Sequence, residues 1–170
     1  MFIDETWAKT NMTRLRGRSP RGERLIEKVP HGHWKTTTLI AALDYQGLRA
    51  ATTVDGAING AVFTAFVRQV LLPTLHPGDL VVLDNLSAHK VEGVREAIES
   101  VAAQVVYLPP YSPDLNPIEN AFSKIKQLLR SARHRAMGPL WTDTQRILDA
   151  VTASDAAGYF RHCGYTLQVE

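Results

Sequence analysis

The amino-acid sequence predicts an α/β domain, in which helices pack in layers against a sheet. Short apolar runs suited to buried strands alternate with segments whose apolar residues recur every three or four positions, the spacing of a helix. The chain has 170 residues, of which 45% are hydrophobic and 21% charged, an ordinary globular composition rather than a disordered one. Its length favours one core, so we expect residues 1–170 to fold as a single domain.

Five apolar segments predict strands. The first is expected to be short and to end at Asp4, because only three residues precede this acid. The other four strands are expected at residues 34–43, 48–54, 80–84 and 105–108. Between the first two strands, residues 11–32 are basic and contain Gly and Pro. Such a long connection is uncommon unless it is functional.

Five further segments have the apolar spacing of helices. They are expected at residues 58–72, 91–101, from 117 onward, 140–151 and 155–163. Asn59 fits a cap for the first of these helices, which should stop before Pro73. Gly164 fits the end of the last one.

Basic residues are clustered, although the formal net charge is only +2. Between residues 9 and 28 there are seven bases and two acids, and residues 121–140 contain five bases and no acid. Clusters of this kind on a nearly neutral chain indicate contact with a polyanion. The alternative interpretation is ordinary solvated surface charge.

The sequence shows no sign of export or of a membrane span. Cys163 is the only cysteine, which excludes an internal disulfide and fits a reducing compartment. The N-terminus lacks a charged leader followed by a long apolar run, so we expect no signal peptide. No apolar stretch approaches the roughly 20 residues that a membrane span needs. We expect a soluble, cytoplasmic protein.

Asp4 and Asp84 each follow an apolar segment that predicts a strand. In α/β sheets, ligand sites gather beyond the carboxyl ends of strands, so the two carboxylates are expected at one edge. The alternative is that each aspartate only caps the turn or helix that follows it.

Glu119 has two interpretations. Asn116 fits the N-cap of the third helix and Pro117 its first position, so Glu119 at the third position would complete a capping box. The same helix face also presents the bases Lys126 and Arg130 behind Glu119. An acid at the head of a basic stripe suits a metal ligand beside a phosphate backbone, and one side chain could serve both roles.

Three carboxylates suit Mg²⁺, which prefers oxygen ligands and completes its shell with water and substrate phosphates. Two such ions, roughly 3.5–4 Å apart, stabilise the attacking and leaving oxygens of phosphoryl transfer, and one shared aspartate with one flanking acid for each ion is enough. His31 and His33 lack a second cluster, so we interpret them as loop residues rather than zinc ligands. There is no P-loop motif to support ATP hydrolysis.

Three blocks of the sequence resemble the signature motifs of DDE transposases. They are FIDET at residues 2–6, LDNLSAHK at 83–90 and LPPYSPDLNPIENAFSKIK at 108–126. More narrowly, they are similar to the mariner superfamily in its bacterial insertion-sequence-630 branch. The 34 residues between Asp84 and Glu119 fit this superfamily, and residues 17–43 also look like this branch.

The resemblance implies an RNase H-like fold, with a central mixed five-stranded sheet flanked by helices. It implies Asp4, Asp84 and Glu119 as catalytic, metal-binding acids, with two Mg²⁺ ions that Mn²⁺ can replace. It implies cleavage of DNA at terminal inverted repeats and transfer of the freed 3′-OH into target DNA at a TA step, by a homodimer on double-stranded DNA. The candidate DNA-binding residues are Arg14, Arg16, Arg18, Arg21, Lys90, Lys124, Lys126, Arg130 and Arg133.

One departure from the family pattern concerns DNA recognition. Full-length relatives begin with a helix-turn-helix region, whereas Asp4 lies close to Met1 here, so we expect that region to be absent or separately encoded. This leaves two alternatives to an active transposase domain. One is a non-catalytic DNA-binding remnant, and the other is a different RNase H-like nuclease, which the SPDLNPIE block disfavours.

Overall fold

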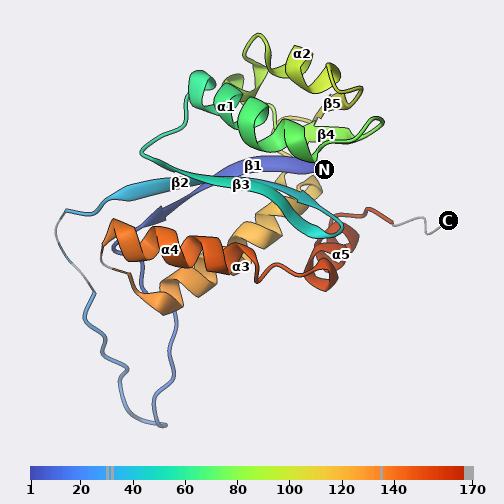
Figure 1. Cartoon of the computed structure of the whole chain (residues 1–170). Coiled ribbons are helices and arrows are strands. Elements are labelled where there is room, and N and C mark those ends of the chain that lie inside the picture. Colours follow the sequence, from blue (N-terminus) through green and yellow to red (C-terminus); the bar gives the residue numbers. More distant parts are fainter. Residues whose placement is uncertain (30, 32, 135, 167–170) are drawn as a thin grey trace.

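The computed structural model describes residues 1–29, 31, 33–134 and 136–166, and within them the chain forms one mixed five-stranded sheet (Figure 1). The strand order is β3-β2-β1-β4-β5. At the centre, β1 (Phe2–Lys9) is antiparallel to β2 (Thr36–Asp44) and parallel to β4 (Leu80–Leu83). On the outside, β3 (Gly47–Asp55) pairs antiparallel with β2, and β5 (Gln104–Tyr107) pairs parallel with β4. The predicted five-stranded mixed sheet is confirmed.

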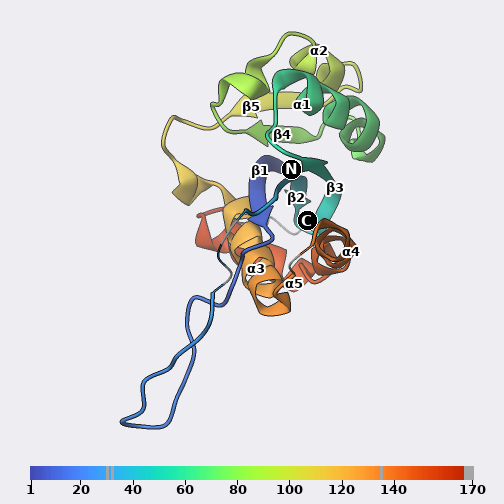
Figure 2. The same cartoon turned by 90° about the vertical axis from the view of Figure 1, so that its left-hand side faces the viewer.

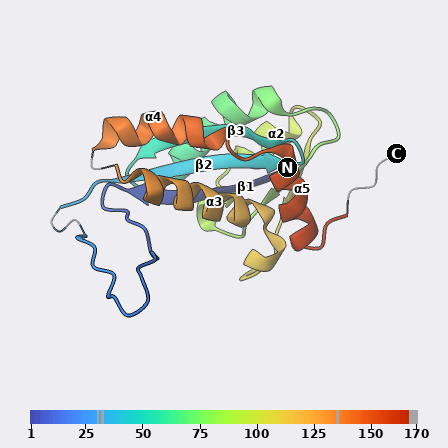
Figure 3. The same cartoon turned by 90° about the horizontal axis from the view of Figure 1, so that it is seen from below.

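Helices cover both faces of this sheet (Figures 1 and 2). One face is covered by α1 (Gly60–Phe66) and α2 (Val94–Glu99). The other face is covered by α3 (Pro117–Ala132), α4 (Met137–Leu148) and α5 (Ala153–His162). Seen from below, α3 and α4 run alongside β1 and β2 (Figure 3). The prediction of a sheet flanked by helices is therefore also confirmed.

Alternate residues of β1 enter two separate apolar cores. Phe2 packs with Phe122 of α3 and with Phe160 of α5, whose ring centroid is 5.4 Å from that of Phe2. Ile3 points to the opposite side and packs in the cluster that contains Phe63 of α1. Burial of each such side chain contributes about 1.5–3 kcal/mol relative to exposure. The two cores fix β1 between the helical layers.

The first strand is longer than predicted. It runs on to Lys9, and every second residue from Asp4 to Ala8 is buried while the residues between them are more exposed. This two-residue period is that of a strand, so the prediction that Asp4 ends β1 is wrong. The parallel pairing with β4 does end there, because its last pair is Ile3 opposite Leu83. Asp4 therefore lies beside the point where the chain leaves β4.

The first helix begins where the sequence predicts, and its α- and π-helical segments end before Pro73, also as predicted. Asn59 is its N-cap, and Asn59 Oδ1 accepts a hydrogen bond from the N–H of Val62 at 3.0 Å. After α1, a π-helical segment, η1 (Val67–Leu71), leads into a 3-10 turn, η2 (Leu72–Thr74). Pro73 lies near the start of this separate turn, where a proline is tolerated because its position needs no N–H donor.

The two closing helices begin earlier than the predicted residues 140 and 155. Helix α4 begins at Met137 and α5 at Ala153. Thr152 caps α5 and accepts a hydrogen bond from the N–H of Asp155 at 3.2 Å, while the Asp155 carboxylate accepts from the N–H of Thr152 at 2.9 Å. Asp155 is therefore a capping-box residue rather than the first residue of the helix. None of the described helices is long and apolar enough to cross a membrane.

The connection between β1 and β2 is a long loop, as predicted, and we call residues 13–35 the arm. The arm projects away from the sheet and the helices (Figures 1 and 2). Its exposed residues include four predicted DNA-binding residues, Arg14, Arg16, Arg18 and Arg21, and the two loop histidines, His31 and His33. Glu27 on the arm pairs with Arg133 at the end of α3, at 2.5 Å. Gly32 of the predicted loop and Arg135 of the second basic cluster lie outside the described residues.

Candidate active site

Asp4, Asp84 and Glu119 line one pocket of about 380 Å³. Asp4 comes from the middle of β1, Asp84 directly follows β4, and Glu119 lies in the first turn of α3. Loops after β4 and β5 supply most of the remaining wall: Asn85, Leu86, Leu108, Pro109, Pro110, Tyr111, Ser112, Pro113 and Asn116. The site thus lies beyond the carboxyl ends of β4 and β5 and beside the middle of β1, and the carboxyl ends of strands are where α/β sheets usually bind ligands.

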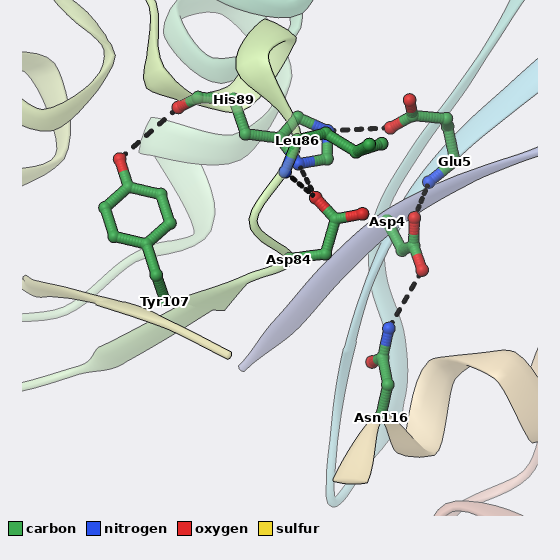
Figure 4. A network of polar contacts seen from close by, with 7 residues as sticks. All are labelled: Asp4, Glu5, Asp84, Leu86, His89, Tyr107 and Asn116. Carbon is green, nitrogen blue, oxygen red and sulfur yellow. Dashed lines mark hydrogen bonds and ion pairs between the residues drawn. The ribbon is translucent and has the colours of Figure 1, made fainter. Parts of the chain in front are cut away.

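Asp84 is fixed through one of its two carboxylate oxygens (Figure 4). Asp84 Oδ1 accepts a hydrogen bond from the N–H of Leu86 at 3.0 Å and lies 2.5 Å from Nδ1 of His89. Partial burial would raise the pKa of Asp84, but the hydrogen bonds from His89 and Leu86 outweigh it and lower the pKa below its ordinary value. Asp84 is therefore an ionised carboxylate at neutral pH.

Asp4 is held differently, in a buried position with an exposed fraction of 6%. Its Oδ1 accepts a hydrogen bond from the N–H of Glu5 at 2.7 Å, and its Oδ2 accepts one from Nδ2 of Asn116 at 2.8 Å (Figure 4). Burial, reinforced by repulsion from the nearby carboxylates, raises the pKa of Asp4 to about 7 against the effect of the Glu5 hydrogen bond. Asp4 therefore changes charge near neutral pH.

The predicted capping box at the start of α3 is wrong. Asn116 is at the N-cap position, but its side chain makes no capping hydrogen bond and donates to Asp4 instead. The N–H of Asn116, which Glu119 would bind in a capping box, donates to the carbonyl oxygen of Pro113 at 3.0 Å. The Glu119 side chain is exposed and lines the pocket, so it remains available to a ligand.

The three acids offer the donor chemistry of a Mg²⁺ site. Within the described residues, no three His, Cys, Asp or Glu side chains form a ready-made metal cage. Mg²⁺ does not require one, because it is commonly held by one or two carboxylates together with waters and substrate phosphates. Asp84 Oδ2 and the exposed carboxylate of Glu119 meet that requirement at one pocket. The residues present therefore fit a divalent metal that is completed by substrate.

Lys126 is a predicted basic residue that interacts electrostatically with Glu119 and Asp4. Burial and the neighbouring Arg130 lower the pKa of Lys126, while Glu119 and Asp4 act in the opposite direction. Its ammonium lies 5.1 Å from the ring centroid of Trp7, and Lys9 lies 4.6 Å from the same centroid. Positive charge and an exposed aromatic ring thus lie beside the pocket.

The other predicted DNA-binding residues fall into two groups. Lys124 pairs with Asp155 of α5 at 2.7 Å, and Arg133 pairs with Glu27, so the charges of both are partly balanced within the protein. The other group makes no such pair with an acid among the described residues: Arg14, Arg16, Arg18, Arg21, Lys90 and Arg130. Arg14, Arg16 and Arg130 line a second pocket, of about 500 Å³, between the arm and α3. Lys90 lies 5.6 Å from the ring centroid of Tyr107.

The sequence prediction assigned no role to His89 or Glu5, although both lie in motifs that it singled out. His89 Nε2 is 2.7 Å from Glu5 Oε2, and this pair joins β1 to the turn after β4. A signal was present, since a histidine follows Asp84 by five residues and an acid follows Asp4 by one. Their pairing depends on β1 lying beside β4, which local sequence patterns do not specify.

Residues 1–138, which include all three acids, match the family model of the DDE superfamily endonucleases, and the chain belongs to this family. No curated protein sequence matches the chain. The family match supports an endonuclease class, and the matched residues include the three acids that line the pocket.

The fold is similar to solved structures of the Mos1 transposase. The mariner Mos1 paired-end complex with Mg is 20% identical with a TM-score of 0.74, covering 96% of this chain and 50% of that chain. For the corresponding complex with Mn, the values are 19%, 0.72, 96% and 51%. The catalytic domain of Mos1 mariner transposase is 18% identical with a TM-score of 0.64, covering 96% and 74%. The chain thus has the RNase H-like fold of that catalytic domain and spans about half the length of the Mos1 chains in the complexes.

Proposed function

We propose that this chain is the catalytic domain of a DNA transposase, which cuts DNA at transposon ends and joins the freed ends to target DNA. The observation that carries the proposal is the meeting of Asp4, Asp84 and Glu119, from three separate elements, at one pocket. Membership of the DDE superfamily endonucleases supports cleavage of nucleic acid as the reaction class. The Mos1 paired-end and strand-transfer complexes support DNA as the substrate.

Asp4, Asp84 and Glu119 would hold Mg²⁺, with Mn²⁺ as a substitute, in a site for two ions that share one aspartate. Mos1 structures with Mg and with Mn support this choice of metal. When bound, the ions would stabilise charge on the attacking and leaving oxygens of the phosphodiester. Asp84 enters the site already ionised, whereas Asp4 must release its proton before it can act as a ligand.

The reaction would proceed in two phosphoryl transfers. Water attacks a phosphodiester at the transposon end, and the bond to the 3′ oxygen breaks to leave a free 3′-OH and a 5′ phosphate. The 3′-OH then attacks a phosphodiester of the target and displaces a second 3′ oxygen. The SPDLNPIE block and the spacing of Asp84 and Glu119 support the insertion-sequence-630 branch of the mariner superfamily, and with it insertion at TA.

DNA would run along the basic side of the pocket. Lys126 and Arg130 follow Glu119 along α3, and the arginines of the arm extend this surface away from the acids. Contacts of this kind bind the phosphate backbone and position the duplex without reading its sequence. Sequence recognition would come from a separate helix-turn-helix region, and two copies would act together on the paired ends.

A plasmid-nicking assay tests the proposed reaction. We expect the protein to nick supercoiled DNA with Mg²⁺ or Mn²⁺ but not with EDTA, and Asp84→Asn to abolish nicking. Asp149→Asn is the matched control, because Asp149 is an exposed aspartate that does not line the pocket with the three acids, and it should nick like the wild type.

Two other outcomes would replace the proposal. DNA binding without metal-dependent cleavage would indicate a non-catalytic DNA-binding remnant. Preference for an RNA–DNA hybrid over duplex DNA would indicate a different RNase H-like nuclease.

A further inference from the structure

His89 occupies a fully buried position between two carboxylates (Figure 4). Its Nδ1 lies 2.5 Å from Asp84 Oδ1, and its Nε2 lies 2.7 Å from Glu5 Oε2. Both ring nitrogens therefore face acceptors, and both can donate only when the imidazole is doubly protonated. Burial alone would lower the pKa of His89, but the hydrogen bonds to Asp84 and Glu5 raise it to about 9. The carboxylates of Asp84 and Glu5 thus hold the ring at both of its nitrogens.

The imidazole ring is also fixed by its surroundings. Its centroid lies 4.3 Å from that of Phe63 in α1, with 35° between the two ring planes. Its backbone lies in the short helix η3 (Ser87–Lys90), and the hydroxyl of Tyr107 donates to its carbonyl oxygen at 3.4 Å. Groups from β1 and α1 therefore meet at the His89 ring, and a group from β5 meets its backbone. A ring held on its face and at both nitrogens has little freedom to rotate.

This arrangement determines how Asp84 is presented to the pocket. Asp84 Oδ1 accepts from both His89 and Leu86, and among the described residues no group donates to Oδ2. Figure 4 shows the second oxygen of Asp84 turned toward Asp4. One oxygen is thus fixed by the protein while the other is open, which is what a carboxylate ligand needs in order to bind a metal in a defined orientation.

We propose that His89 is a positioning residue that fixes Asp84 through Oδ1, with Glu5 as its second anchor, so that Oδ2 faces the metal site. The proposal rests on the proposed function, because it assigns His89 a role in the same metal site. Glu5 and Asp4 are neighbours on β1, so the bridge through His89 also ties Asp84 to the strand that bears Asp4. The two aspartates are therefore held to one another by protein contacts before DNA or metal arrives.

The alternative is that His89 is only a buried ion pair that stabilises the fold. The two roles differ in what they change, because a positioning residue affects metal affinity in a protein that remains folded. Outer-shell partners of metal ligands typically contribute about 10–100-fold to affinity. A purely structural residue would change the unfolding temperature and leave the affinity of the folded protein unaltered.

The test measures Mn²⁺ binding to the full chain without DNA, by electron paramagnetic resonance of free Mn²⁺, together with the unfolding temperature. His89→Phe keeps a ring beside Phe63 but removes both donors, and we expect Mn²⁺ affinity to fall by about 10–100-fold. His89→Gln keeps one donor for Asp84 and should lose less. If His89→Phe does not fold, His89→Gln alone decides, because a measurable loss of affinity is still expected.

Two control variants distinguish a loss of Mn²⁺ affinity caused by misplacing Asp84 from one caused by a lower unfolding temperature. Phe66→Leu perturbs the same apolar core without touching an acid, and it should bind Mn²⁺ like the wild type at a similar loss of unfolding temperature. His76→Phe removes an exposed histidine that lies 3.8 Å from Asp79, and it should change neither quantity.

The result that overturns the proposal is wild-type Mn²⁺ affinity in folded His89→Phe and His89→Gln while Asp84→Asn binds Mn²⁺ weakly. If Asp84→Asn also binds Mn²⁺ like the wild type, the proposed metal site itself is wrong and the role of His89 is wrong with it.

Discussion

The two aspartates of the site differ in how the protein holds them. Asp84 is partly exposed, bound through one oxygen by a buried histidine, and its pKa is lowered. Asp4 is buried, bound through both oxygens by neutral N–H donors, and its pKa is raised to about 7. The same residue type thus has opposite pKa shifts at the two positions, because burial dominates at Asp4, whereas the hydrogen bonds from His89 and Leu86 outweigh burial at Asp84. At neutral pH Asp84 is ionised, while Asp4 is near the midpoint of its titration.

The largest expected effect is on catalysis, where the two aspartates should be alike. Asp4→Asn and Asp84→Asn should each lower the metal-dependent nicking rate by more than about 100-fold, the upper range for outer-shell partners of a metal. The unfolding temperatures of the two variants should differ in opposite directions from that of the wild type. Asp4→Asn removes a carboxyl that is costly to ionise in a buried position, so it should raise the unfolding temperature in EDTA at pH 8. Asp84→Asn removes the anion opposite His89 and should lower it.

Differential scanning fluorimetry beside the nicking assay checks both parts. Equal shifts of the unfolding temperature in the two variants would remove the proposed difference between the sites.

Glu119 should be required for catalysis, like the two aspartates, but should not contribute to the stability of the fold. Because no capping box forms, Glu119→Gln should abolish nicking and leave the free energy of unfolding within about 0.5 kcal/mol of the wild type. Glu96 is the matched control, since its carboxylate accepts a hydrogen bond from the N–H of Gly93 at 2.7 Å at the start of α2. Glu96→Gln should keep full activity, and Glu96→Ala should lose about 1 kcal/mol, the usual cost of a lost cap.

Urea unfolding of these three variants measures the difference. A destabilised Glu119→Gln, or one that still nicks DNA with Mg²⁺, would return Glu119 to the role of a helix cap.

The pH dependence of stability should carry the signature of Asp4. Its pKa rises from 3.8 in the unfolded chain to about 7 in the folded protein, so the folded state binds more protons between these values. The free energy of unfolding should therefore fall as the pH rises from about 4 to about 7, by about 4 kcal/mol at 1.36 kcal/mol per pKa unit. His89 should add a second loss of stability between about pH 6.5 and 9, because its pKa is also raised.

Unfolding curves in EDTA from pH 4 to 9 test this for the wild type and Asp4→Asn. The variant should lack the loss between pH 4 and 7 and keep the one above it. Wild-type stability that rises from pH 4 to 7, as for an ion-paired aspartate, would contradict the account of Asp4.

The smallest expected effect concerns DNA affinity on the two sides of the pocket. Lys126 lies on the Asp4 side and Lys90 on the Asp84 side, and neither forms an ion pair with an acid among the described residues. Each change to Ala should flatten the plot of log affinity against log salt by about one unit. Lys124→Ala is the control, since Lys124 is paired with Asp155, and its slope should remain near the wild-type value.

Fluorescence anisotropy with random duplex DNA across a salt series gives the slopes. A slope that changes only for Lys126→Ala would place DNA on the Asp4 side alone.

The sequence predicts the elements of this fold better than their junctions. Apolar runs and helical spacing identify the five strands and the helix that begins at Pro117, because burial imposes those periods. The sequence does not predict the end of β1 because Glu5 and Lys9 are charged and Thr6 is polar, although the burial of Thr6 and Ala8 continues the strand. The start of α3 was found, but its capping was not, because Asn116 has a partner 112 residues away.

For the candidate site, too, the sequence predicts the individual residues better than the contacts between them. Its three acids lie in motifs that can be recognised one at a time, and the structure brings them to one pocket. Their supporting partners were not predicted, because His89, Glu5 and Asn116 act across β1, β4 and α3. The pair of His89 with Glu5 follows from the parallel pairing of β1 with β4, which involves only Phe2 and Ile3 on β1, and the pair of Asn116 with Asp4 follows from the packing of α3 beside β1.

We infer that Asp4, Asp84 and Glu119 together hold divalent metal against DNA. The most direct measurement is an anomalous difference map from crystals of the protein with nicked duplex DNA and Mn²⁺. We expect Mn²⁺ peaks in the pocket, with Oδ2 of Asp84 and the carboxylate of Glu119 among the ligands and a DNA phosphate completing the shell. Mn²⁺ bound elsewhere, or DNA seated away from this pocket with no metal between the three acids, would contradict it.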